Sequence, residues 1–444
     1  MSNPQASSQT KKSTNLGLIL LSSTLAFVFG LLVCFIALKS RTQPPLNETN
    51  SIDTIEQPIQ PVEIDAIQVS PTRTHGKTVT AIRTLSKGFE FKSKVDFQVG
   101  GLASEERSTK QSYLAEYSLT VNEPKPALSL QEVIASTPDL SSSLPGLSSL
   151  LETATINPYW HELYRRKKKT VIDDSHYLNE LITKHNFYDC QTMLNLRHPE
   201  TQRRALLVQA DMDVVTDGSD GDRMPTMPEE ITTATYYQPT TSYSWAKTTE
   251  NPNPMIAGFQ TRINNADAEL AAIETPPDRA KWLRERKKML QGKIDEMKER
   301  SFLIAEHDPF IVLPVPVIVA KDTYSPNVGD YAVVFHKGKA YPSIVGDAGP
   351  SYKMGEASLR IAHEIDKRSG STWRPVSDLS VTYLIFPGTR KQPHRAPDYN
   401  EIKEECKKLL NEVGGLGTTL FKWEDKLAPL TEVIIEPENN TEEE

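Results

Sequence analysis

The sequence predicts a mixed, β-rich fold: a β-barrel with an inserted αα-hairpin, preceded by an N-terminal transmembrane helix. Three observations lead to this prediction. Strand-like apolar runs dominate the second half of the chain, helical spacing of apolar residues is concentrated in 257–300, and a long uncharged apolar run lies near the N-terminus. A chain of 444 residues with 24% charged and 38% hydrophobic residues exceeds one average domain, and this balance excludes wholesale disorder and fibrous repeats.

The apolar run lies between Ser13 and Leu38 and contains no charged residue. A helix of this length reaches about 36 Å and covers a hydrocarbon core of about 30 Å. A cleaved signal peptide is the alternative, but the run is long for one and lacks a small-x-small exit. We therefore expect a single-pass anchor over 15–38 behind a short tail, 1–14. The long polar body favours a cell-membrane location with the large domain on the outer, periplasmic or extracellular, side.

The charge distribution separates a basic N-terminus from an acidic body. The chain carries 50 basic and 58 acidic side chains, a net charge of -8. Residues 1–41 hold four bases and no acid, so the remainder has 46 bases and 58 acids, a net charge of -12. Phosphate binding needs a basic face, so this balance argues against nucleic acid as the main partner. It is compatible with a cationic ligand.

Linkers are expected to alternate with one small unit between the anchor and the large domain. Residues 39–75 are rich in Pro, Thr and Asn and are predicted to form a spacer. Apolar residues alternate around Phe97 and again around Leu119, which predicts a small β-rich unit over 76–123. The Pro- and Ser-rich stretch 124–156 is predicted to be a second linker.

The large domain is expected over 157–427 and is followed by an acidic tail over 428–444. It begins with an amphipathic helix over 160–185 that contains five consecutive basic residues, 165–169. That run is either a patch for phosphate or an anionic polymer, or a solvated helix face, and no base-stacking aromatics nearby support the first interpretation. Strand-like runs then follow at 205–210, 310–320, 331–335, 343–345 and 381–386.

Helical spacing interrupts these strands. Phe259 and Ile263 begin one apolar stripe and Leu283 and Leu290 another, on either side of a Thr-Pro-Pro-Asp turn. This pattern predicts an αα-hairpin over 257–300, inserted into the β-rich domain. Its narrow apolar stripe leaves two interpretations: a coiled coil that contacts another protein, or packing on its own body.

Five aspartates follow one of the strands, at Asp211, Asp213, Asp217, Asp220 and Asp222. The spacing misses the calcium-loop pattern and no Glu closes the site, so we predict no metal here. The remaining interpretations are a solvated turn and a loop that holds a positively charged substrate by charge-assisted hydrogen bonds. Asp211 and Asp213 directly extend the apolar strand, and we choose them as substrate-binding candidates.

A second pair of acids lies further along the chain. Asp347 follows a strand that ends at Gly346, and Glu356 opens an expected helix over 356–365. The loop between them can aim both carboxyl groups into one cleft. Inverting glycoside hydrolysis needs such a pair, one group to donate a proton and one to activate water. A turn and a helix N-terminus are, however, sufficient structural reasons for an Asp and a Glu at these places.

Six motifs occur in one order: Ala210-Asp-Met-Asp213, Gln238-Pro-Thr-Thr-Ser-Tyr243, Asp308-Pro-Phe-Ile-Val-Leu-Pro314, Gly329-Asp-Tyr-Ala-Val-Val334, Gly346-Asp347 and Gly355-Glu-Ala-Ser358. This set resembles glycoside hydrolase family 75, the fungal and bacterial endo-chitosanases, over roughly 186–390. The resemblance implies hydrolysis of the β-1,4 linkages of chitosan with inversion, and it places the essential Asp and Glu at Asp347 and Glu356. A six-stranded double-psi barrel would fit the family. The loop 348–355 is shorter than in fungal members, which puts the carboxylate separation in question.

The chemistry of chitosan agrees with this resemblance. Chitosan is a polycation at mildly acidic pH, and the five-aspartate loop can supply an acidic cleft for it. Tyr243 and Trp245, which follow the Gln238-Pro239 segment, are candidates for stacking on sugar rings, with ordinary core filling as the alternative. We expect no cofactor.

The roles of the two acids follow from their expected surroundings. Asp347 comes after two apolar residues and lies near a second acid, both of which raise a carboxyl pKa and suit a general acid. Glu356 at a helix N-terminus should stay ionised, which suits a general base.

The leading hypothesis is therefore a membrane-anchored, outward-facing glycoside hydrolase acting on chitosan or a related amino-sugar polymer. One alternative is a non-catalytic, envelope-anchored protein that binds polysaccharide or serves as a scaffold. Another is a peptidoglycan-cleaving enzyme, for which an acidic cleft would be a handicap. Three cysteines are too few for a disulfide scaffold, and the sequence leaves open whether Cys190 and Cys406 pair.

Overall fold

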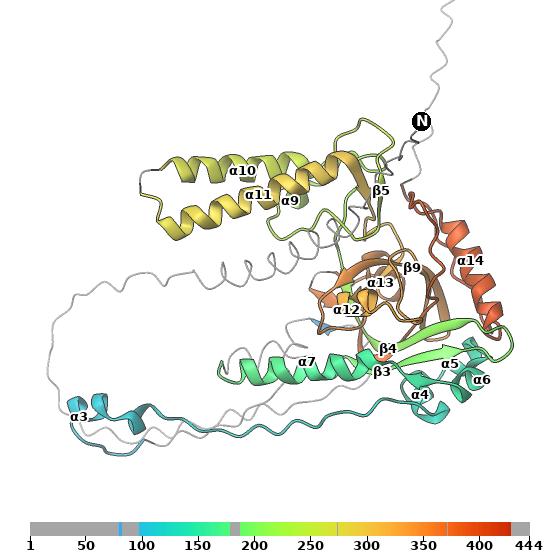
Figure 1. Ribbon diagram of the computed structural model, residues 1–444, viewed down its shortest axis with the longest axis horizontal. Coiled ribbons are helices and arrows are strands. Elements are labelled where there is room, and N and C mark those ends of the chain that lie inside the picture. Colours follow the sequence, from blue (N-terminus) through green and yellow to red (C-terminus); the bar gives the residue numbers. More distant parts are fainter. Residues whose placement is uncertain (1–79, 82–96, 178–186, 273, 371, 428–444) are drawn as a thin grey trace, which may run out of the picture. The chain divides into compact units, whose positions relative to one another are not determined.

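The computed structural model describes residues 80–81, 97–177, 187–272, 274–370 and 372–427 (Figure 1). The predicted anchor over 15–38, the first linker and the acidic tail over 428–444 lie outside the described residues. Among the described residues, no helix is both long enough and apolar enough to cross a membrane.

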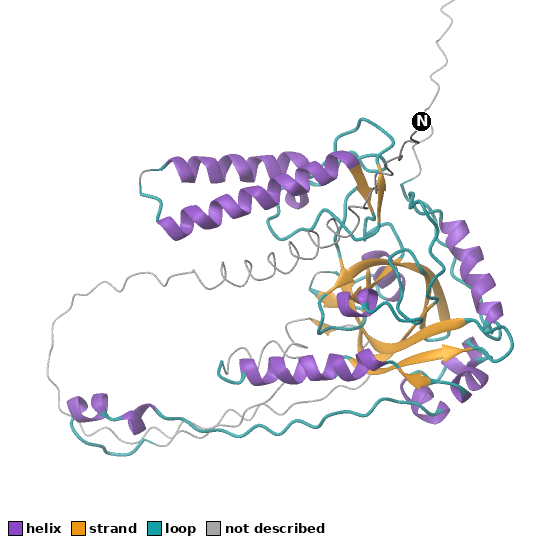
Figure 2. Ribbon diagram, viewed as in Figure 1, coloured by secondary structure: helices purple, strands orange, loops and turns teal. Residues whose placement is uncertain are grey.

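Six strands of the described chain close into a barrel, which Figure 2 shows as a ring of orange arrows. Around the ring these strands are β4 (Arg204–Val215), β12 (Val376–Ile385), β8 (Tyr331–His336), β9 (Lys339–Gly349), β7 (Phe310–Pro314) and β10 (Glu356–Ser358). The ring closes because β10 also pairs with β4. The β10–β4 and β7–β9 pairs are parallel, and the other four pairs are antiparallel. The prediction of a β-rich fold built on a barrel is confirmed.

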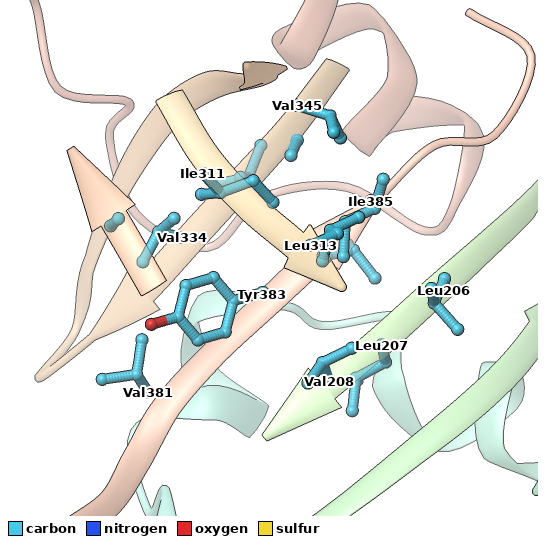
Figure 3. Packing of buried hydrophobic residues seen from close by; sticks show 14 of the residues in the cluster. Leu206, Leu207, Val208, Ile311, Leu313, Val334, Val345, Val381, Tyr383 and Ile385 are labelled. Atoms are coloured by element: carbon cyan, nitrogen blue, oxygen red, sulfur yellow. The ribbon is translucent and has the colours of Figure 1, made fainter. Parts of the chain in front are cut away.

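The barrel encloses a core of aliphatic and aromatic side chains. Figure 3 shows residues from β4, β7, β8, β9 and β12 gathered in one cluster, among them Leu207, Ile311, Val345 and Tyr383. These four side chains are 0–2% exposed. Burial of one aliphatic side chain of this size contributes about 1.5–3 kcal/mol, so the cluster gives the strands a fixed register.

Several further described elements lie outside the six barrel strands. They are β2 (Thr155–Ile156), β3 (Cys190–Arg197), α7 (Pro158–Asp174), α9 (Glu229–Thr232), β5 (Ser244–Ala246), β6 (Arg300–Phe302), α12 (Val315–Val319), α13 (Leu359–Ile365) and α14 (Tyr399–Glu412). β3 and β2 extend the sheet beyond β4, and β5 pairs with β6. Cys190 of β3 and Cys406 of α14 are both buried and are free thiols, so they do not pair.

The prediction of a linker over 124–156 is wrong. This stretch forms three short helices, α4 (Leu130–Ser136), α5 (Leu140–Ser143) and α6 (Leu147–Glu152), whose apolar residues join the barrel core. Its Pro and Ser content concealed leucines three to four positions apart, which is the spacing of a buried helical face. Gln209 Nε2 of β4 donates to Val133 O at 2.9 Å and so ties α4 to the barrel. The compact domain therefore begins well before residue 157.

The small β-rich unit predicted over 76–123 is also absent from the described part of that range, apart from a two-residue strand. There the chain forms α3 (Ala103–Ser108), a short 3-10 helix and extended segments. Phe97 is 95% exposed and lies in no strand, and neither does Leu119. Alternating apolar residues form a strand only where a partner edge pairs with them. The strand of this range, β1 (Thr80–Ala81), pairs instead with β11 (Trp373–Arg374).

The predicted helix over 160–185 is α7, which ends at Asp174. Its five consecutive basic residues all find acidic partners. The pairs are Arg165–Glu162, Arg166–Glu162, Lys167–Asp189, Lys168–Glu123 and Lys169–Asp173. The run is thus mostly a paired, solvated helix face, whereas Lys167 is buried against Asp189.

A helical hairpin stands where the sequence predicted one, as α10 (Ile256–Ala271) and α11 (Pro277–Glu299). Its two helices pack together through a second apolar cluster, which includes Phe259, Ile263, Leu290, Ile294 and Met297. Tyr237 and Phe302, from the chain on either side of the hairpin, belong to the same cluster. The hairpin therefore packs on its own body.

Candidate active site

Neighbouring barrel strands place three acidic residues in one row. Asp347 of β9 pairs with Val312 of β7, and Val312 pairs in turn with Glu356 of β10. Glu356 also pairs with Asp213 of β4. Residues that pair across strands project to the same face of a sheet, so these side chains point the same way. All three acids are partly exposed.

Strand spacing sets the separations along this row. Asp347 and Glu356 lie two strands apart, with Val312 between them. Because neighbouring strands are about 4.8 Å apart, their α-carbons are separated by about 10 Å. Glu356 and Asp213 are on adjacent strands and so lie about 5 Å apart.

Two glycines shape the row. The β7–β9 pairing skips Gly346, because Ile311 pairs with Val345 and Val312 with Asp347. This bulge turns Asp347 onto the face of Val312. Gly355 has a φ of 81°, and a Cβ there would lie 2.3 Å from Asp211 O. Only glycine fits this left-handed, crowded position, and it delivers the chain into β10 at Glu356.

Glu356 lies on a strand, which corrects the prediction that it opens a helix over 356–365. The helix α13 begins only at Leu359, with Ser358 in extended conformation at its N-cap. Glu356 is held by pairing with β7 and β4 instead. No helix N-terminus therefore keeps Glu356 ionised, and the reason for predicting Glu356 as the base no longer holds.

The surroundings of Glu356 favour its protonated form. Burial raises the pKa of Glu356 to about 8, with a further contribution from the charge of Asp213, while Lys353 opposes the shift. Its carboxyl group makes no hydrogen bond to other described residues. A neutral carboxyl at near-neutral pH can give its proton to a leaving group.

Asp347 has a different environment. Its Oδ1 accepts hydrogen bonds from Ser242 N at 2.8 Å, from Ser242 Oγ at 2.5 Å and from Ala348 N at 2.8 Å. Burial raises the pKa of Asp347, but these donors and the charge of Lys293 oppose that effect. All the hydrogen bonds with other described residues fall on Oδ1, so Oδ2 is available to another molecule.

Asp217 is a third acid near Asp347 and Glu356. Burial, and next the charge of Asp347, raise its pKa to about 7. It also contributes to the raised pKa of Glu356. In the sequence, Asp217 is distinguished only as a member of the five-aspartate loop, for which a solvated turn is a sufficient explanation. Ser242 gave a sequence signal only through its place in the Gln238–Tyr243 motif.

Most of the five-aspartate loop is neutralised within the protein. Asp220 pairs with Arg223 at 2.6 Å and Asp222 with Lys247 at 2.9 Å. Among the described residues, no group of three or more His, Cys, Asp or Glu is arranged to hold a metal ion. Asp220 and Asp222 therefore add little negative charge to the acidic cleft that the loop was expected to supply, because cations from the same fold meet their carboxylates.

Asp211 and Asp213, both predicted to bind substrate, have different positions. Asp211 is 1% exposed and its Oδ2 accepts from Arg374 Nη1 at 2.6 Å. It lies beneath the row and cannot contact a polymer, so the prediction for Asp211 is wrong. Asp213 also pairs with Arg374, but its side chain stays 17% exposed beside Glu356. The two aspartates are two residues apart on β4 and so project to the same face, where both meet Arg374, but Asp211 is the more buried of the two.

Tyr243 and Trp245 are core residues, which corrects their prediction as a platform for sugar rings. They are 8% and 5% exposed. The ring of Tyr243 stacks on His394 with centroids 4.2 Å apart, and Arg223 covers Trp245 at 5.1 Å from the ring centroid. Aromatic residues next to a motif can either fill the core or stack on sugar rings. Here the ring faces needed for stacking on a sugar are already occupied.

Comparison with known families agrees with this site. Residues 212–422 match the model of the fungal chitosanases of glycosyl hydrolase group 75. This domain belongs to that family. The match includes Asp213, Asp347 and Glu356, and at its C-terminal end it extends past α14, further than the motifs alone indicated. None of the curated proteins compared with the chain matches it. The family predicted from the ordered motifs is confirmed, so the chain carries a glycoside hydrolase domain of the chitosanase type.

Proposed function

We propose that the chitosanase-family domain cleaves the β-1,4 linkages of chitosan with inversion, using Glu356 as general acid and Asp347 as general base. The observation that carries this assignment is the contrast between the two carboxyl groups. Glu356 has a pKa of about 8 and no hydrogen-bonding partner among the described residues, so it holds a proton at mildly acidic pH. Asp347 accepts hydrogen bonds at Oδ1, which favour its ionised form. These roles reverse those expected from the sequence.

The separation of the two acids supports the inverting scheme. Carboxyl groups of inverting glycosidases lie about 6.5–9.5 Å apart, which leaves room for a water molecule on the far side of the sugar ring. The α-carbons of Asp347 and Glu356 lie about 10 Å apart across Val312, which leaves room between the two side chains for a carboxyl separation in this range. The shorter loop over 348–355 does not shorten this separation, because strand pairing sets it.

The acidic row also suits an amino-sugar substrate. Asp213 and Asp217 add two carboxyl groups around the reacting pair, and both are partly exposed. A protonated amine of chitosan beside them gains charge-assisted hydrogen bonds. Peptidoglycan, whose amino groups are acetylated on most sugars, offers no such cation.

Two further parts of the sequence prediction are kept as proposals. We propose that the run over 15–38 anchors the chain in the cell membrane with the domain on the outer side; its length and lack of charge support this. We also propose that the barrel is of the double-psi type, which its combination of parallel and antiparallel pairs favours.

Turnover and the product anomer test the proposed function. We expect the detergent-solubilised full chain to release reducing ends from chitosan, with the α-anomer as the first product seen by NMR. An initial β-anomer would contradict the inverting scheme. Absence of turnover would favour the non-catalytic polysaccharide-binding alternative, provided that the protein still binds chitosan.

The pH dependence tests the assignment of roles. Glu356 must be protonated to act as the acid, so kcat/KM should be retained below pH 8 and fall as the pH rises through about 8. Asp347 must be ionised to act as the base, so kcat/KM should also fall as the pH drops through its own pKa. Profiles on short chitosan oligosaccharides, corrected for the titration of their amines, measure both limbs. Activity that keeps rising beyond pH 9 would contradict the role of Glu356.

A further inference from the structure

The inserted hairpin reaches the active site through one lysine. Lys293 of α11 donates from Nζ to Thr240 Oγ1 at 2.7 Å, and Nζ lies 3.1 Å from Glu296 Oε2. Its side chain is 28% exposed. The flanking residues Leu290 and Ile294 are buried in the hairpin cluster, so the backbone that carries Lys293 is held firmly.

Thr240 belongs to the segment 238–243, which supports the proposed base. Gly218 N donates to Gln238 O at 2.8 Å, and Ser219 Oγ to Pro239 O at 2.7 Å. Tyr243 N donates to Gly346 O at 2.9 Å, next to Asp347. Within this segment, Ser242 supplies two of the three donors to Asp347 Oδ1. The contact from Lys293 thus holds the segment two residues before Ser242.

The charge of Lys293 matters as well as its hydrogen bond. The charge of Asp347 raises the pKa of both Asp217 and Glu356, so this group of acids disfavours several negative charges at once. Lys293 acts in the opposite direction and lowers the pKa of Asp347. The hairpin therefore brings a cation to the side of the row where a base is needed.

We propose that Lys293 is a positioning residue for Asp347, so that the inserted hairpin is part of the active site and not an accessory to it. Its ammonium group keeps Asp347 ionised, and its bond to Thr240 holds the segment from which Ser242 orients that carboxylate. This inference rests on the proposed function only in naming Asp347 as the base. The placement of Lys293 beside the Asp347 segment stands on its own.

The test measures the Asp347 carboxyl group directly as well as turnover. The full chain is labelled with carboxyl-¹³C aspartate, and the Asp347 signal is assigned by its loss in Asp347→Asn. Lys293→Met should raise the pKa of this signal by about half a unit to one unit, since a partly exposed cation shifts a neighbouring carboxyl by less than a buried one. The acidic limb of kcat/KM should move by the same amount. Lys293→Arg keeps the charge and should restore both values.

Lys298→Met provides the matched control, because Lys298 is on the same helix, is 60% exposed and, among the described residues, pairs only with Asp295, at 4.0 Å. Lys298→Met should change neither the pKa of the Asp347 signal nor the acidic limb of the kcat/KM profile. If the Asp347 signal moves in Lys293→Met but the wild type does not cleave chitosan, the proposed function fails and the placement of Lys293 stands. If the signal does not move in Lys293→Met, the inference about Lys293 is overturned whether or not chitosan is cleaved. The arginine variant covers the case in which the methionine variant does not fold.

Discussion

Glu356→Gln should lower the turnover of chitosan by about a thousandfold, because the amide has no proton to give to the departing sugar. The row geometry stays the same, since Gln is isosteric and β10 is held by β7 and β4 through its backbone. Substrate binding should therefore change little, and the loss should appear in kcat. Initial rates of reducing-end release, with binding measured separately by titration calorimetry, distinguish the two.

The stability of this variant supplies a control for the loss of activity. Burial raises the folded-state pKa of Glu356 to about 8 from its ordinary value of 4.5. Such a group favours folding at low pH, and that contribution is lost as the pH rises through about 8. Gln does not titrate, so Glu356→Gln should be at least as stable as the wild type at pH 8. Glu364→Gln, on the neighbouring helix α13, should retain nearly full activity. A Glu356→Gln variant that keeps more than a tenth of wild-type turnover would contradict the assignment.

Asp347 provides the complementary part of the same prediction. Asp347→Gly removes the base and leaves space on that side of the row, so azide should restore turnover by attacking in place of activated water. Since attack comes from the face opposite the leaving group, the product should be the α-glycosyl azide. Azide should not restore Glu356→Gln, because that variant lacks the acid. Formation of the β-glycosyl azide would contradict a role for Asp347 in activating water on the face of the sugar opposite the leaving group.

The proposed catalytic pair could be chosen from the sequence, whereas its surroundings could not. Asp347 and Glu356 are close in the chain, and a glycine directly precedes each of them. Asp213 lies beside Glu356 only because β10 closes the barrel against β4, a pairing between segments far apart in sequence. Ser242 likewise donates to Asp347, and Lys293 to Thr240, over long sequence separations. No local pattern encodes such contacts, so the proposed reversal of the two roles rests on the structure and not on the sequence.

Burial was the other property that sequence patterns left undecided. The strands around Leu207, Ile311 and Val345 were predicted, because continuous apolar runs are typical of barrel interiors. The helices over 130–152 were missed, because Ser and Pro dominate their composition and their leucines become a buried face only against the barrel. For Tyr243 the error was the opposite one. The sequence predicted a ring accessible to substrate, whereas the ring is buried in the core.

Arg374→Met should cost about 3–5 kcal/mol of the free energy of unfolding, the largest stability effect that we expect from a single substitution in this domain. Arg374 is 7% exposed at its side chain, and Nη1 lies 2.6 Å from Oδ2 of Asp211, which is itself buried. It also pairs with Asp213 of the active-site row. Met fills a similar volume but leaves the Asp211 carboxyl without its cation in a buried place. Urea denaturation, followed by tryptophan fluorescence, measures the loss.

The pH dependence of this loss tests its cause. Burial raises the pKa of Asp211 while Arg374 lowers it, so removing Arg374 raises the pKa further. A raised folded-state pKa means that stability is lost as the pH increases, and the deficit of Arg374→Met should therefore be larger at pH 8 than at pH 5. Adding Asp211→Asn removes the titrating group and should remove most of this pH dependence. Arg368→Met breaks a pair whose arginine is 70% exposed and should cost less than about 1 kcal/mol. A deficit in Arg374→Met as small as that, or one independent of pH, would show that the buried pair does not hold β4 and β11 together beneath the row.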